Sequence, residues 1–98
     1  MKLANKVAVI TGAGSGMGKA AALLFAAEGA AVAAADIKRD AAVATANEIT
    51  EKGGRAIGLG VDVSNSAQVQ GMFEQAVKQF GHLDIAYNNA GVIEEHEL

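Results

Sequence analysis

Four glycines fall within the eight residues TGAGSGMG, from Thr11 to Gly18, directly after the apolar run VAVI. A residue without a side chain lets the backbone turn tightly, or lets a ligand approach the main chain closely. The unpaired N–H groups at the start of a helix carry partial positive charge, which suits a phosphate group. A glycine-rich turn between a strand and a helix therefore predicts a phosphate-binding loop. A simple tight turn is the alternative.

Three of these glycines are expected to have different roles. Gly12 would let the chain turn sharply, Gly16 would let a pyrophosphate approach the backbone, and Gly18 would let the next helix pack closely against the sheet. Their spacing, T-G-x-x-x-G-x-G, differs from the literal G-x-G-x-x-G pattern. It also differs from the phosphate loop G-x-x-x-x-G-K-S/T, so both of those motifs are excluded.

An acidic residue follows the loop at an informative distance. Asp36 stands 24 positions after Gly12 and 18 after Gly18, which brackets the roughly 20 expected for the acid that binds an adenosine ribose. Its carboxylate could accept hydrogen bonds from both ribose hydroxyls and would repel a 2′-phosphate. The residue therefore favours NAD over NADP as cofactor, with an ordinary strand-end or helix-capping role as the alternative.

Polar residues also follow the third and fourth strand candidates. In VDVSNS, residues 61–66, Asp62 and Val63 could hold the edge and face of an adenine. A plain turn acid is the alternative for Asp62. In NNAG, residues 88–91, the asparagine side chains could pin neighbouring strand ends, and Ala90 and Gly91 would leave room for a ribose.

These residues require strands that end close together. Strands are expected over residues 6–11, 31–36, 55–61 and 83–88, and helices over 16–28, 40–52 and 66–80. The first and last strand candidates are nearly continuous apolar runs, as expected for strands covered on both faces. Strands that alternate with helices indicate right-handed β-α-β units and a parallel sheet. We therefore expect one α/β domain over residues 1–98, with four strands in the order 3-2-1-4, half of a doubly wound sheet.

The helices show apolar faces and one clear capping signal. Ser64 or Asn65 is the expected N-cap of the third helix. The core face expected for the first helix comprises Met17, Ala20, Ala21, Leu24 and Ala27. The face expected for the third comprises Val69, Met72, Phe73, Ala76, Val77 and Phe80.

Composition excludes several classes of protein. There is no cysteine, so neither a disulfide framework nor a thiolate metal site is possible. A net charge of −3 without a basic cluster argues against a nucleic-acid partner. No run approaches the roughly 20 apolar residues of a membrane span, and the start has no secretory signal, so we expect a cytoplasmic location and no membrane partner. The terminal HEL stops before the second histidine of a metal-binding H-E-x-x-H, so no metal site is expected.

Four features together resemble the short-chain dehydrogenase/reductase family: T-G-x-x-x-G-x-G, an acid after strand two, Asp-Val after strand three, and Asn-Asn-Ala-Gly after strand four. The resemblance spans residues 6–92 and implies a Rossmann-like fold, with hydride transfer between NAD(P) and an alcohol or carbonyl. It implies that Asp36 binds the adenosine ribose, that Asp62 and Val63 bind the adenine, and that Asn89 lies near a cofactor ribose. The residues that it places around the pyrophosphate and its ribose are Gly12, Ser15, Gly16, Met17 and Gly18.

The family's catalytic groups are missing from this sequence. They are a serine, a further asparagine and a Tyr-x-x-x-Lys pair, in which the tyrosine acts as acid and base. Tyr87 is the only tyrosine, Gly91 stands four positions later, and Tyr87 is expected to be a sheet residue. His82 is expected to be a solvated loop residue. We therefore expect no catalytic residue here, and a chain that corresponds to the cofactor-binding portion of an NAD-dependent oxidoreductase, cut short after the fourth strand.

Three alternatives remain open on the sequence. The first is a stand-alone dinucleotide-binding module. The second is a non-catalytic interaction fragment, because an apolar edge over residues 83–87 invites pairing with another chain and self-association. The third is a methyltransferase that uses S-adenosylmethionine, in which NNAG and the glycine spacing would have no role.

Overall fold

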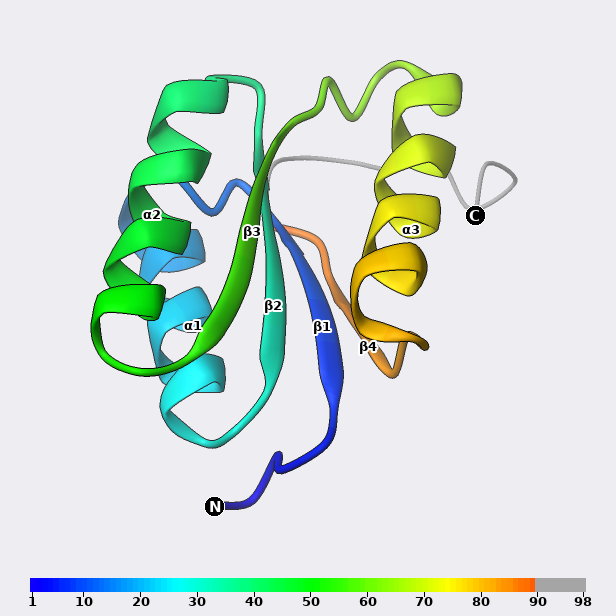
Figure 1. Ribbon diagram of the computed structural model, residues 1–98. Coiled ribbons are helices and arrows are strands. Elements are labelled where there is room, and N and C mark those ends of the chain that lie inside the picture. The colour runs from blue at the N-terminus through cyan, green and yellow to red at the C-terminus, as the bar shows by residue number, and fades with distance from the viewer. Residues whose placement is uncertain (90–98) are drawn as a thin grey trace.

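A four-stranded parallel sheet with helices on both faces forms the molecule in the computed structural model, which describes residues 1–89 (Figure 1). The elements in chain order are β1 (Val7–Thr11), α1 (Gly16–Ala27), β2 (Ala31–Asp36), α2 (Arg39–Glu51), β3 (Arg55–Gly60), α3 (Ser66–Phe80) and β4 (Ile85–Tyr87).

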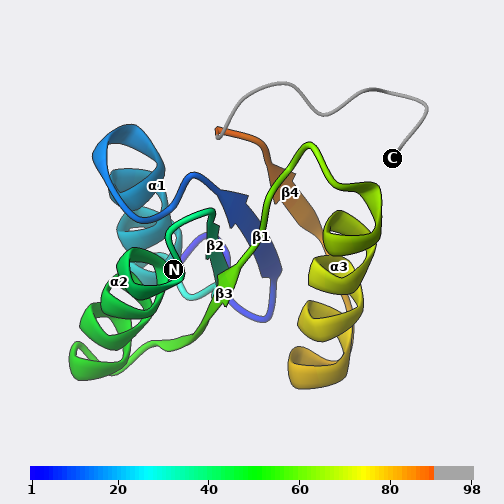
Figure 2. The ribbon, with the colours of Figure 1, turned by 90° about the horizontal axis from the view of Figure 1, so that it is seen from above.

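The strand order is β3-β2-β1-β4, and every neighbouring pair is parallel. The view along the sheet shows α1 and α2 on one face and α3 on the other (Figure 2). The predicted Rossmann-like half-sheet is therefore confirmed. Because all four strands run the same way, their carboxyl ends meet at one edge, where ligands of such sheets bind.

The two central strands are buried on both faces. All five residues of β1 are buried, and so are the first five of β2. The composition AVAAA of residues 31–35 favours a helix, yet this segment pairs as a strand with both β1 and β3. Its small side chains let helices approach the sheet from both sides, so tertiary packing overrides the local preference.

Side chains alternate between two apolar clusters across the sheet. One lies under α1 and α2, where Ile10 and Val32 meet Ile49. The other lies under α3, where Val9 and Ala33 join residues of that helix. For α3, the burial of Val69, Met72 and Ala76 confirms the predicted face, except that Val77 is exposed.

The face predicted for α1 is wrong except at Ala21, which packs against the core. The structure buries Gly18 and Ala22, whereas Met17 and Leu24, both assigned to the core, are 73% and 59% exposed. Nearly every residue of this helix is apolar, so its sequence does not show a single stripe. The contact with β2 and α2 decides the face.

The last strand also differs from the prediction. It is limited to Ile85–Tyr87, shorter than the expected range 83–88, and it lies at the edge of the sheet. Ala86 is exposed and the other two residues are partly buried, so β4 is not covered on both faces in residues 1–89. An apolar run predicts that a strand forms. Whether both faces of that strand are buried depends on which other elements pack against it.

Candidate functional site

The glycine loop lies at the carboxyl edge of the sheet, between β1 and α1 (Figure 1). Gly12 and Gly16 have φ angles of 65° and 57°, which residues with a side chain rarely adopt. The sharp turn predicted at Gly12 is therefore confirmed. Gly16 also turns the chain, which the sequence interpretation had not assigned to it.

Gly18 is required by close approach. A Cβ atom on this residue would overlap the Gly12 carbonyl oxygen and would lie 2.9 Å from Asn89 Nδ2. The predicted close packing is therefore present, but its partner is the turn that leaves β1 and not the face of the sheet. This contact holds the first turn of α1 against the loop and places Asn89 beside it.

The amino terminus of α1 is open to solvent. Its N-cap, Ser15, makes no side-chain capping hydrogen bond, and no acidic residue lies in the first turn. A Cβ on Gly16 would meet no atom within 4 Å, and Ser15, Gly16 and Met17 are all exposed. This end of the helix therefore retains the N–H groups and the partial positive charge that bind anions.

Asp36 lies beside the loop and is held in place by two backbone N–H groups. Gly14 N donates to Oδ2 at 2.9 Å, and Lys38 N donates to Oδ1 at 3.0 Å. A carboxylate has about four lone-pair sites, so two remain for a further ligand. The strand-end alternative describes part of what Asp36 does, since its carboxylate braces both the glycine loop and the turn into α2, whose N-cap is Lys38.

A pocket of about 280 Å³ joins three of the segments singled out in the sequence. That volume lies near the lower end of small-molecule sites, about 300–1,000 Å³. Its walls are Gly12, Asp36, Ile37, Val61, Asp62 and Val63. The fold thus brings together four predicted site residues from the ends of β1, β2 and β3.

Asp62 is ordered by its neighbour Ser64. The Ser64 hydroxyl and amide donate to Oδ1 of Asp62 at 2.7 and 3.0 Å. The hydrogen bond from the Ser64 hydroxyl, and to a smaller extent the one from its amide, hold the pKa of the Asp62 carboxyl below its ordinary value. Asp62 is therefore both a turn acid and an ionised group in the wall of the pocket.

The ends of β1 and β4 are joined through Thr11. Its hydroxyl donates to Asn88 Oδ1 at 2.8 Å and accepts from Asn89 N at 3.0 Å. The expectation that asparagine side chains pin neighbouring strand ends is confirmed for Asn88, whereas Asn89 takes part through its backbone N–H. Ala90 and Gly91, expected to leave room for a ribose, lie outside the described residues.

Sequence reasoning missed two residues of this region. Gly14 received no role, yet a Cβ there would lie 2.6 Å from Ala41 Cβ and 2.9 Å from Asp36 Oδ2. Thr11 was treated only as the end of a strand. For Thr11 a signal existed, because a buried threonine at a strand end needs a hydrogen-bond partner. Gly14 offered none, since its neighbour belongs to a distant helix.

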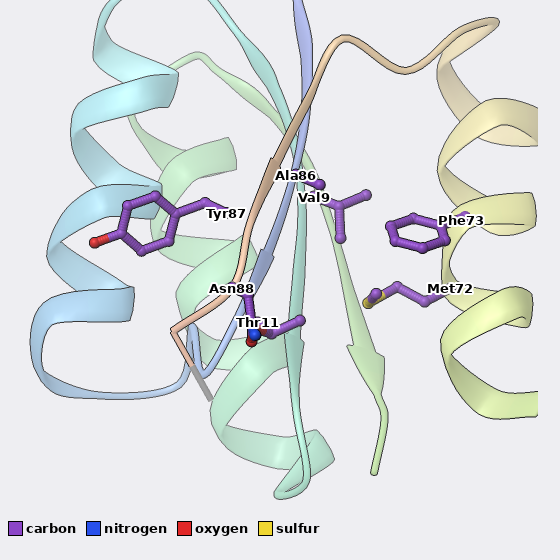
Figure 3. A pocket seen from close by; sticks show the side chains of 7 residues that line it. All are labelled: Val9, Thr11, Met72, Phe73, Ala86, Tyr87 and Asn88. Atoms are coloured by element: carbon purple, nitrogen blue, oxygen red, sulfur yellow. The ribbon is translucent and has the colours of Figure 1, made fainter. Parts of the chain in front are cut away.

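A second pocket, of about 100 Å³, lies between α3 and the β1–β4 pair (Figure 3). Val9, Met72 and Phe73 make it largely apolar, and it contains none of the predicted site residues. Tyr87 turns its ring away from Phe73, toward α1 (Figure 3), where it packs edge-on against Phe25 with ring centroids 6.0 Å apart. Tyr87 is thus the sheet residue that was expected.

His82 lies near the opposite end of β1, far along the strand from the glycine loop. Its Nε2 is 2.8 Å from Asp84 Oδ2 and 3.0 Å from the Asn5 carbonyl oxygen. The side chain is about half exposed, so the predicted loop position is right. Solvation alone does not describe it, because it ties the segment before β1 to the segment before β4.

Within residues 1–89, no group of three or more His, Asp or Glu side chains is arranged to hold a metal ion. None of the helices in this part of the chain is both long enough and apolar enough to cross a membrane.

Known proteins with similar sequences support the same fold. The family described as short chain dehydrogenase matches residues 6–98. A subunit of a hydroxy(phenyl)methylsuccinyl-CoA dehydrogenase from Thauera aromatica is 47% identical over 92 residues, which cover 94% of this chain and 37% of the relative. Cyclohexanol dehydrogenase from an Acinetobacter strain is 44% identical over 94 residues, covering 96% and 38% of the two chains. The chain thus spans somewhat more than a third of the length of these curated relatives.

Solved structures agree as well. A 7α-hydroxysteroid dehydrogenase in complex with NADH and 7-oxo glycochenodeoxycholic acid matches with a TM-score of 0.90 and 40% identity, over 93% of this chain and 36% of that one. The glycine loop, the braced acid after β2 and the joined ends of β1 and β4 thus occur in a chain whose sequence and fold both match one group of enzymes. The protein belongs to the short-chain dehydrogenase family.

Proposed function

We propose that this chain binds the adenosine and pyrophosphate parts of NAD, as the cofactor-binding portion of an NAD-dependent alcohol or carbonyl oxidoreductase. One observation carries the proposal. The pocket that joins Gly12, Asp36, Asp62 and Val63 lies beside the uncapped amino terminus of α1. Such an arrangement offers an apolar wall, a carboxylate and anion-binding amides to a single ligand.

The residues present fit the chemical groups of a dinucleotide. Ile37, Val61 and Val63 supply apolar surface for an adenine, and the two remaining lone-pair sites of Asp36 suit ribose hydroxyls. The open space at Gly16 and the N–H groups of the first turn suit the pyrophosphate. Bound NAD supplies the hydride acceptor. The residues of this chain bind and orient it.

Proton transfer is assigned to no residue of this chain. The 98 residues contain no Tyr-x-x-x-Lys pair, and Tyr87 packs against Phe25 within the fold. Since the chain spans only 37% and 38% of two curated relatives, we propose that it is the first part of a single Rossmann-type domain. Its relatives suggest a small alcohol or a steroid as substrate class of the whole enzyme, and we propose a cytoplasmic location for it.

Asp36 is proposed to select NAD over NADP, because a carboxylate repels a 2′-phosphate. The residue that follows, Ile37, is 70% exposed and carries no charge to offset that repulsion. The family neighbour solved with NADH agrees with this choice. The selection therefore depends on the charge of one side chain, and removal of that charge tests it.

Calorimetric titration of the chain with NAD and NADP measures the selectivity directly. We expect NAD to bind at least about tenfold more tightly, the ratio equivalent to about 1.4 kcal/mol, and Asp36→Ala to bring the ratio close to one. Asp40→Ala removes a nearby negative charge, exposed in the first turn of α2, and should leave the ratio unchanged. An unchanged ratio in Asp36→Ala would refute the role of Asp36, and absence of heat with wild-type protein would refute cofactor binding.

A stand-alone dinucleotide-binding module is a second candidate, favoured by the small size of the pocket. Equal affinities for ADP-ribose and NAD would support it, because the nicotinamide then adds nothing. Tighter binding of NAD would support the oxidoreductase portion.

We also propose that the chain self-associates through β4, whose one pairing partner among residues 1–89 is β1. An unpaired strand edge offers N–H and C=O groups to another chain. Sedimentation velocity over a concentration series tests this: a constant monomeric coefficient would contradict self-association.

A further inference from the structure

Thr45 is one of two buried polar residues in the described chain, and it points from α2 toward the glycine loop. Its side chain is only 1% exposed, and its hydroxyl donates to the Ala13 carbonyl oxygen at 2.8 Å. The two residues are 32 positions apart in the sequence. A buried hydroxyl thus links the second helix to the middle of the loop proposed to hold the pyrophosphate.

Thr50, on the same helix, shows that this bond is not the usual one for a helical threonine. Its hydroxyl donates to the Ala46 carbonyl oxygen, four residues earlier, at 3.0 Å. A helical threonine ordinarily bonds in this way within its own helix. Thr45 instead donates outside the helix, to the loop.

The bond fixes one side of a single peptide plane. In a planar trans peptide the C=O and the following N–H point in opposite directions. The Ala13 carbonyl bonds to Thr45, and the Gly14 N–H bonds to Asp36 Oδ2 at 2.9 Å. Two side chains, one from α2 and one from the end of β2, thus hold the Ala13–Gly14 peptide from both sides.

Without this clamp, the loop has a way to rearrange. Ala13 stands between two glycines, Gly12 and Gly14, and because glycine tolerates both signs of φ, this part of the loop can adjust at low steric cost. Loss of the Thr45 hydroxyl leaves the buried Ala13 carbonyl without this donor, and the loop can shift so that water reaches the carbonyl. Such a shift would move the N–H groups of Ser15, Gly16 and Met17, which are proposed to bind the phosphates.

We propose that Thr45 is a positioning residue for pyrophosphate binding, acting through the Ala13–Gly14 peptide. The inference rests on the proposed function of the loop. Thr45 lies outside the adenosine pocket, where Asp36 and Asp62 keep their own bonds to the Lys38 and Ser64 amides. Loss of the Thr45 hydroxyl therefore weakens the binding of phosphates and spares the binding of adenosine.

Amide-resolved NMR titrations of the full chain, with ADP and separately with adenosine, test this. We expect Thr45→Val to raise the dissociation constant for ADP about five- to tenfold, equivalent to about 1–1.4 kcal/mol, and to change that for adenosine less than about twofold. Thr45→Ser keeps the hydroxyl and should restore ADP binding. Thr50→Val removes the ordinary helical bond and should change neither constant.

The ratio of the dissociation constants for ADP and adenosine distinguishes a positioning role of Thr45 from an effect on protein stability. A variant that only unfolds part of the population weakens ADP and adenosine by the same factor, and this result would overturn the proposal, as would unchanged constants. If Thr45→Val does not fold, Thr45→Ala takes its place with the same ratio as readout and the same two overturning results. Wild-type protein that binds neither ligand would refute the proposed function itself, a result distinct from wild-type binding with an unaltered ratio.

Discussion

The helices α1 and α3 begin in opposite ways. At α3 the Asn65 side chain accepts a hydrogen bond from Gln68 N at 3.0 Å, and the Gln68 side chain accepts one from Asp62 N at 2.8 Å. At α1 the N-cap is Ser15, whose side chain makes no capping bond, and the first turn contains two glycines. One terminus is closed by its own side chains, and the other is left open.

This difference separates structure from function at the same edge of the sheet. A capping side chain typically stabilises a helix by about 1 kcal/mol. The terminus of α1 forgoes that stabilisation, and its position is held instead by the contact of Gly18 with Gly12. We infer that α1 keeps its N–H groups for a ligand, whereas α3 uses them for folding. Paired substitutions in the two helices and their caps test that difference.

The largest change in the free energy of unfolding is expected when the glycines inside the two helices are substituted. A methyl group at Gly18 would overlap the Gly12 carbonyl oxygen, whereas one at Gly71 in α3 would meet no atom within 4 Å. We expect Gly18→Ala to lower the free energy of unfolding by about 3 kcal/mol through overpacking. Gly71→Ala should raise it by about 0.5–1 kcal/mol, since alanine favours a helix. Urea unfolding measures both, and equal effects of the two substitutions would contradict the difference between the helices.

The caps are expected to show the next largest effect. Asn65→Ala removes a bond to the first turn of α3 and should lower the free energy of unfolding by about 1 kcal/mol. Ser15→Ala removes no capping bond and should change it by less than about 0.5 kcal/mol. Thermal or urea unfolding measures both changes in the free energy of unfolding. A loss at Ser15 as large as that at Asn65 would show that the α1 terminus is capped in solution.

The smallest effect concerns the carboxyl that precedes α3. Ser64→Ala removes the largest cause of the lowered Asp62 pKa, so that pKa should rise toward its ordinary value. Titration of the carboxyl carbon by NMR measures it, and an unchanged pKa would show that the hydroxyl is not bonded in solution.

Ser64→Ala should also change the free energy of unfolding, because protonation of Asp62 is coupled to folding. Because the pKa of Asp62 is lower in the folded state than in the unfolded state, the bonds from Ser64 contribute fully above the unfolded pKa. The contribution is lost as pH falls through the folded pKa. Ser64→Ala should therefore reduce stability at neutral pH and leave it nearly unchanged in strong acid.

Much of this architecture was predictable because it follows from local patterns. Apolar runs that alternate with helical segments predict the parallel sheet, and Asn65 is an N-cap that the sequence identified as one of two options. The pocket at the ends of β1, β2 and β3 follows from the parallel direction of the strands. In these cases residue type and spacing are enough to predict the structural feature.

The remainder depends on partners far away in the sequence. The buried face of α1 could not be found from an alanine-rich helix, because its apolar residues point in every direction. The roles of Gly14 and Thr45 depend on Ala41 and Ala13, which only the folded chain brings near. Sequence spacing predicts which segments meet, but not which atoms close the contacts between them.

The open terminus of α1 is proposed to bind a diphosphate beside Asp36. Titration of isotopically labelled chain with ADP, followed at each backbone amide, tests it most directly. We expect the largest shifts at Ser15, Gly16 and Met17, with further shifts at Asp36 and Val63. Shifts confined to the apolar pocket at Met72 and Phe73, or no shifts at all, would contradict it.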